Sequence, residues 1–145
     1  MFANLLKNLL EPEATSLAPA DARLAISALL VRVAQSDNNY EAAEISKIDR
    51  VLATRYQIDQ KAAVVLRTKG EALEKEAPDT VRFTRAIKDA VPFEERVSVI
   101  EALWQVALAD GERDAEEDAL LRLVANLLGI TDVESAAARK RVASD

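Results

Sequence analysis

Four acidic side chains, arranged as two similar pairs, are the residues of this sequence best placed to do chemistry. Asp110 and Glu117 are the ends of the segment Asp-Gly-Glu-Arg-Asp-Ala-Glu-Glu, and Asp37 and Glu44 are the ends of a degenerate copy 73 residues earlier. Carboxylate oxygens are the ligands that hard divalent cations such as Ca, Mg and Mn prefer. Acids at such positions also cap helices, so the spacing alone leaves both uses open.

Helical phase indicates that each pair faces inward. Eleven residues at 100 degrees each return to within about 20 degrees of the starting direction, so an acid eleven residues along an apolar stripe shares its face. In the first copy the stripe before the loop leads to Asp37 and the stripe after it starts at Glu44; in the second copy the corresponding acids are Asp110 and Glu117. The two preceding stripes are Ile26, Leu30, Val33 and Val99, Leu103, Val106; the two following stripes are Ile48, Val51 and Leu121, Val124, Leu128.

An inward carboxylate needs a partner, because burying it bare costs several kcal/mol. Backbone amides of the loop could supply it, with Glu117 closing a capping box from Asp114. A second source is an arginine of the middle segment, Arg82, Arg85 or Arg96, and a third is a divalent cation shared by Asp and Glu. An EF-hand is excluded, since it needs Gly at position 6 and Glu at position 12 of its loop. Counting from the loop aspartates places Ala115 and Leu121, or Ala42 and Ile48, at those positions.

Composition narrows the chemistry further. The chain has no histidine and no cysteine, which removes the usual zinc ligands, the usual neutral-pH base and thiolate nucleophiles. Nothing supplies a phosphate cradle or an oxyanion hole, so we expect no enzymatic activity. The net charge of −6 argues against nucleic acid as a partner. The acidity lies in the two loops: Asp110 to Asp118 sums to −5 and Asp37 to Glu44 to −3.

The elements that must position these acids are helices. Three glycines, four prolines and no long run of alternating β-branched residues predict an all-α fold, a single domain over residues 1–145 with seven to eight helices. We expect two pseudo-repeated helix-loop-helix units, residues 24–55 and 97–128, around two central buried helices. Asp59, the Thr131–Glu134 capping box and Gly129 predict helix ends, whereas Gly70 falls inside a helix at a cost of about 1 kcal/mol. Arg82 and Arg85 form a weak candidate for a small basic binding surface.

The N-terminal residues 1–10 predict a short amphipathic helix with Phe2, Leu5, Leu6 and Leu9 on one face. We expect it to pack on the domain or to form a homodimer contact. No apolar run reaches the 18 to 20 or so residues of a transmembrane helix, and no secretory signal is present, so the predicted location is cytoplasmic.

Several short segments together resemble the tellurite-resistance TerB-like family of bacterial proteins, most strongly from Thr80 to Arg141. They are Arg82-Phe83-Thr84-Arg85, Phe93-Glu94-Glu95-Arg96, Ala102-Leu103-Trp104-Gln105-Val106-Ala107, Ala109-Asp110-Gly111 with Glu117, and Leu127-Leu128-Gly129-Ile130. The resemblance implies an all-helical, pseudo-repeated bacterial domain that is cytoplasmic or peripherally associated with a membrane. A similar domain also occurs attached to a membrane-anchored J-domain co-chaperone.

The resemblance further implies a role in tellurite or general stress response, with divalent-ion binding at the acidic loops. That proposal carries over to Asp110 and Glu117 and, through the repeat, to Asp37 and Glu44. The first loop departs from the pattern, because Asn38 replaces the glycine and Glu41 stands where Asp114 caps. The expected function is therefore a non-enzymatic stress-response module acting through protein contacts, with a divalent cation at its Asp-Gly loop. The alternative is a structural scaffold or homodimer without metal, whose acids serve as helix caps.

Overall fold

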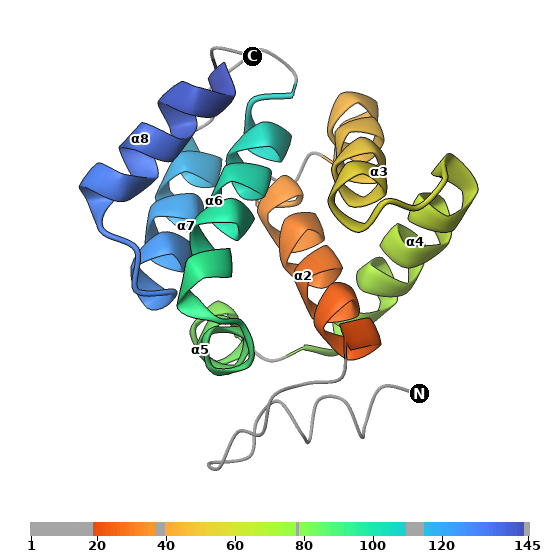
Figure 1. The fold of residues 1–145 in the computed structure, drawn as a ribbon, viewed down its shortest axis with the longest axis horizontal. Helices are drawn as coiled ribbons and strands as arrows, with labels where there is room; N and C mark the ends of the chain where they lie inside the picture. Colours follow the sequence, from red (N-terminus) through yellow and green to blue (C-terminus); the bar gives the residue numbers. More distant parts are fainter. Residues whose placement is uncertain (1–18, 37–39, 78, 110–114, 144–145) are drawn as a thin grey trace.

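The computed structural model describes residues 19–36, 40–77, 79–109 and 115–143, and within them every regular element is an α-helix. In chain order the seven helices are α2 (Pro19–Ala34), α3 (Ala42–Tyr56), α4 (Gln60–Glu76), α5 (Thr80–Ala90), α6 (Phe93–Ala107), α7 (Ala115–Leu127) and α8 (Asp132–Ala143). Figure 1 shows them as a bundle with α2 and α6 at its centre. The all-α prediction is confirmed.

Helix ends lie where the sequence signals predicted them. The Asp59 carboxylate accepts a hydrogen bond of 2.7 Å from the Ala62 amide and begins α4. Before α8, the Glu134 amide donates to the Thr131 hydroxyl and the Thr131 amide donates to the Glu134 carboxylate, both at 3.1 Å, which is a complete capping box. Gly129 follows α7 with φ +80°, the left-handed conformation that glycine adopts without strain.

The internal repeat includes a third helix in each copy. The offset of 73 residues that pairs the acidic loops also pairs Ala42, the start of α3, with Ala115, the start of α7. The same offset makes α8 the counterpart of α4. α4 packs against α2 and α3, and α8 packs in the same way against α6 and α7. We call α2, α3 and α4 the first unit and α6, α7 and α8 the second unit. Figure 1 shows them on opposite sides of the molecule, with α5 beneath.

The core is formed by the apolar stripes that define the repeat. α2 and α6 contact each other, and each also contacts α3 and α7. These two helices are therefore the buried centre that the pattern predicted. Residues at equivalent positions are buried in both units: Leu30 and Leu103, Val33 and Val106, Ile48 and Leu121, Val51 and Val124. Burial of each such side chain contributes about 1.5 to 3 kcal/mol.

Gly70 lies inside α4 because α2 comes very close there. A Cβ atom at this position would lie 3.1 Å from the Ala28 backbone nitrogen and closer still to the Ser27 hydroxyl oxygen. That hydroxyl donates a hydrogen bond of 3.3 Å to the Leu66 carbonyl, one turn earlier in α4. The low helix propensity of glycine is therefore offset by close packing between the two helices.

Two predictions remain, one about the N-terminal helix and one about membrane-spanning helices. The N-terminal helix of residues 1–10 lies outside the described residues, and its packing or homodimer role stays a prediction. Among the described helices, none is both long and apolar enough to cross a membrane.

Candidate functional site

Glu44 is the member of the four acidic candidates whose surroundings the structure describes. It lies in the first turn of α3, and its side chain is fully buried. The prediction that helical phase turns this carboxylate inward is confirmed. A carboxylate at this place is also favoured by the positive end of the helix dipole.

The structure does not describe the side chains of the other three candidates. Glu117 belongs to α7, and its side chain lies outside the described residues, as do Asp37 and Asp110. Whether Asp and Glu converge across each loop therefore stays a prediction. The repeat nevertheless relates Glu117 to Glu44, since each is the third residue of the helix after its loop.

The described residues contain no group of three or more acidic, histidine or cysteine side chains able to hold a metal ion. A site with three or more such ligands on the acidic loops would thus include side chains from the segments 37–39 or 110–117. The donors there are oxygen atoms alone, since histidine and cysteine are missing from the whole sequence. Such a donor set suits a hard cation such as Ca, Mg or Mn.

The structure describes two of the three arginines that could pair with an inward carboxylate, Arg85 and Arg96. The Arg96 guanidinium donates to the carbonyl oxygens of Val91 and Lys88, both at 3.0 Å, so it holds the C-terminal end of α5. Arg85 is exposed, and the Arg82 side chain is outside the described set. Phe83 and Thr84 between them are buried. The proposed basic surface therefore retains one described member, Arg85.

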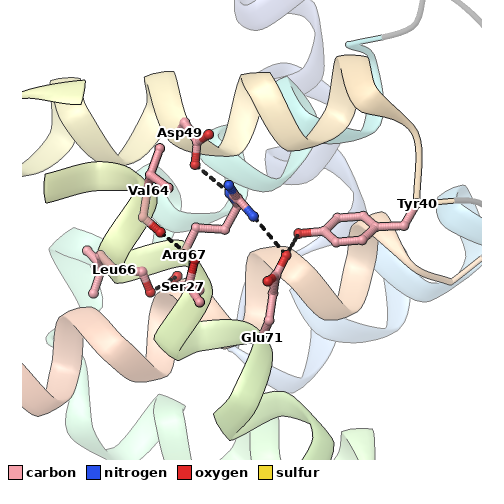
Figure 2. A network of polar contacts seen from close by, with 8 residues as sticks. Ser27, Tyr40, Asp49, Val64, Leu66, Arg67 and Glu71 are labelled. Carbon is pink, nitrogen blue, oxygen red and sulfur yellow. Dashed lines mark hydrogen bonds and ion pairs between the residues drawn. The ribbon is translucent and has the colours of Figure 1, made fainter. Parts of the chain in front are cut away.

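A partly buried polar network, which was not predicted from the sequence, lies next to the first acidic loop (Figure 2). Arg67 of α4 donates to Asp49 of α3 at 2.6 Å and to Glu71 at 2.9 Å, and the Tyr40 hydroxyl donates to the same Glu71 carboxylate at 2.7 Å. Tyr40 is the residue that follows the undescribed segment 37–39. The network therefore fastens the end of this loop to α4.

The electrostatics of the network follow from its partial burial. Burial acts to lower the pKa of Arg67, but the hydrogen bonds and charges of Asp49 and Glu71 outweigh it and raise that pKa. Burial, together with the hydrogen bond to Glu71, raises the pKa of the Tyr40 hydroxyl well above its ordinary value. Arg67 thus stays charged and Tyr40 neutral. The one sequence signal for this network was the (i, i+4) spacing of Arg67 and Glu71.

The fold and these loops define a class: an all-helical, internally repeated domain with an acidic loop between the first two helices of each repeat. The family model described as Tellurite resistance protein TerB matches residues 23–140. The chain belongs to this family, as its sequence motifs indicated.

One solved structure supports the same fold. A protein of unknown function from Porphyromonas gingivalis is similar with a TM-score of 0.61 and 20% sequence identity, over 90% of this chain and 95% of that one. At this level of identity the similarity concerns the fold alone. No curated protein matches the chain.

Proposed function

We propose that this chain is a non-enzymatic stress-response module of the tellurite-resistance type, which acts through protein contacts and binds a divalent cation at its second acidic loop. Membership in the TerB family supports the assignment to the tellurite-resistance type. The lack of histidine and cysteine supports a non-enzymatic role and a preference for hard cations. It leaves the chain with oxygen ligands and no thiol with which to bind or reduce tellurite.

The observation that carries the cation proposal is the burial of Glu44. This carboxylate was expected to turn inward because it begins the apolar stripe of the helix after its loop, and it is fully buried. Glu117 begins the stripe of α7 in the same way, and its loop has the more favourable sequence, with Gly111 for a left-handed turn and Asp114 for a cap.

Asp110 and Glu117 would hold the cation in the second loop, with Asp37 and Glu44 as the weaker equivalent in the first. A bound cation would neutralise carboxylates that the fold turns inward and would join the end of one helix to the start of the next. Its role in this proposal is to stabilise the loop as a surface for a protein partner.

The test is thermal unfolding of the full chain in EDTA and in millimolar Ca, Mg or Mn. A cation present at 100 times its dissociation constant adds about 2.7 kcal/mol, which raises the melting temperature by about 5 to 10 °C in a chain of this size. Asp110→Asn and Glu117→Gln should remove the increase.

The matched controls are Glu112→Gln and Glu116→Gln, which remove charge from the same segment at positions that helical phase directs to solvent. These should keep most of the increase. If no cation raises the melting temperature, or if the increase survives in Asp110→Asn and Glu117→Gln, the acids act as helix caps and the module is a metal-free scaffold. Light scattering before and after removal of residues 1–10 then tests the homodimer.

A further inference from the structure

A groove between α3 and α6 carries positive charge in a protein whose net charge is −6. Its volume is about 370 Å³, and its walls include Lys47, Arg50 and Arg55 from α3. Among its described lining residues Glu101 is the one acid, and it forms an ion pair of 3.1 Å with Arg141 of α8. The groove therefore has an excess of cations.

Two of these cations have no acidic partner. Among the described residues, neither Lys47 nor Arg50 forms an ion pair. Arg55 donates a hydrogen bond of 2.9 Å to the Ser98 hydroxyl and stacks over the Tyr56 ring, while its buried Nε atom has no hydrogen-bond partner. Among the described residues, the groove thus offers two unpaired positive charges to a ligand, those of Lys47 and Arg50.

The groove continues into a second hollow of about 270 Å³, which shares Lys47, Arg50 and Gln105 with the first. Leu108 and Val142 line this second hollow, and Val51 and Ala102 line the first. The cations therefore lie between two hollows that also have apolar walls. A compact anion would fill a small part of this space, whereas a short peptide with both carboxylate and apolar side chains would fill it.

We propose that this groove between α3 and α6 binds an acidic, partly apolar peptide segment of a partner protein, with Lys47 and Arg50 pairing with its carboxylates. The inference rests on the part of the proposed function that has the chain act through protein contacts, and names the partner's chemistry. A long polyanion such as nucleic acid fits less well, because it would extend past the groove along a chain that as a whole carries −6.

The test is fluorescence anisotropy of a labelled peptide, Glu-Glu-Leu-Glu-Glu-Leu-Glu, titrated with the full chain. The peptide should bind saturably and more weakly as salt rises, and its uncharged counterpart with Gln in place of Glu should bind at least about tenfold more weakly. The double variant Lys47→Glu with Arg50→Glu should weaken binding about tenfold or more.

The matched control is Lys61→Glu with Lys69→Glu, two exposed lysines of α4 that line neither hollow. It changes the net charge equally and should weaken binding by less than about twofold. Glu101→Gln should strengthen binding, because it removes the groove's acid and frees Arg141. A destabilised chain would not bind more tightly, so this variant separates a binding effect from misfolding.

Equal weakening by the two double variants, no saturable binding by the unmodified chain, or no gain in Glu101→Gln would overturn the proposal. So would tighter binding of a single-stranded oligonucleotide of equal charge through Lys47 and Arg50. These readouts do not depend on metal, so failure here and failure of the cation test in EDTA are distinguishable.

Discussion

The two three-helix units share a backbone arrangement and an apolar core, yet they are held together by different polar contacts. In the first unit Arg67 joins α3 to α4 through Asp49, and Arg32 of α2 forms an ion pair of 3.1 Å with Glu74 at the end of α4. In the second unit the indole N–H of Trp104 in α6 donates to the Ser135 hydroxyl of α8 at 3.1 Å, and Arg139 stacks over the Trp104 ring at 5.6 Å.

Neither set of polar contacts can form in the other unit, because the residues at the equivalent positions differ. At the position equivalent to Asp49 the second unit has Arg122, and at the position equivalent to Arg67 it has Lys140, so the same pairing would bring two cations together. At the positions equivalent to Trp104 and Ser135 the first unit has Val31 and Ala62. The apolar pattern therefore determines the shared fold, while each unit has its own polar contacts.

The largest expected effect comes from removing the centre of the ionic network. Arg67→Ala should lower the free energy of unfolding by about 3 kcal/mol, because it leaves Asp49 buried with its charge uncompensated. Arg139→Ala in the second unit should cost about 0.5 to 1 kcal/mol, the value of an accessible cation–π contact. Urea unfolding of the full chain measures both changes.

The double variant Asp49→Ala with Arg67→Ala is the control for this contrast. It should cost less than the two single changes added together, because the partners are removed as a pair. Equal losses for Arg67→Ala and Arg139→Ala would contradict the idea that the first unit depends on a partly buried ionic network that the second unit lacks among its described residues.

The second effect concerns how closely the helices approach within each unit. Gly70→Ala should destabilise the chain by about 1 to 3 kcal/mol through overpacking against Ser27 and Ala28, although alanine is the better helix former. Circular dichroism during thermal unfolding measures the loss. The position equivalent to Gly70 in the second unit is Ala143, an exposed residue at the end of α8.

Ala143→Gly is the matched control and should change stability by less than about 0.5 kcal/mol, since helix ends fray. If Gly70→Ala stabilised the protein instead, α2 and α4 would not be packed as closely as the structure describes.

Much of this architecture could be predicted from the sequence, since it depends on local signals. The 3.6-residue period of the apolar residues gave the helices, Asp59 and Thr131 gave two of their starts, and the phase of the stripe gave the burial of Glu44. Each of these signals acts within one helix or one turn, so the sequence alone contains it.

The remainder depends on contacts between helices. Arg67 and Asp49 are 18 residues apart, and Trp104 and Ser135 are 31 apart, so no local spacing predicts these pairs. The groove on α3 likewise exists only because α6 and α8 pack beside Lys47 and Arg50. Gly70 shows the same limit, because sequence indicates its cost in a helix and only the packing of α2 explains it.

The smallest expected effect separates the two tyrosines of the first unit, neither of which has an aromatic equivalent in the second. Tyr40→Phe should cost about 1 kcal/mol, because it removes the hydrogen bond to Glu71. Tyr56→Phe should be neutral or slightly stabilising, because the buried Tyr56 hydroxyl makes no hydrogen bond with any described residue. Urea unfolding near neutral pH measures both.

High pH tests the same contrast through the phenol of Tyr40. Burial and the Glu71 hydrogen bond raise the pKa of Tyr40 in the folded chain above its unfolded value of about 10. Its contribution to stability is therefore fully present below about pH 10 and is lost as pH rises towards the higher folded pKa, since the unfolded phenol releases its proton first. Between about pH 9 and pH 11 the unmodified chain should lose more stability than Tyr40→Phe does. Parallel losses would mean that the Tyr40 hydroxyl does not belong to the network, and that the loop end is held to α4 by other contacts.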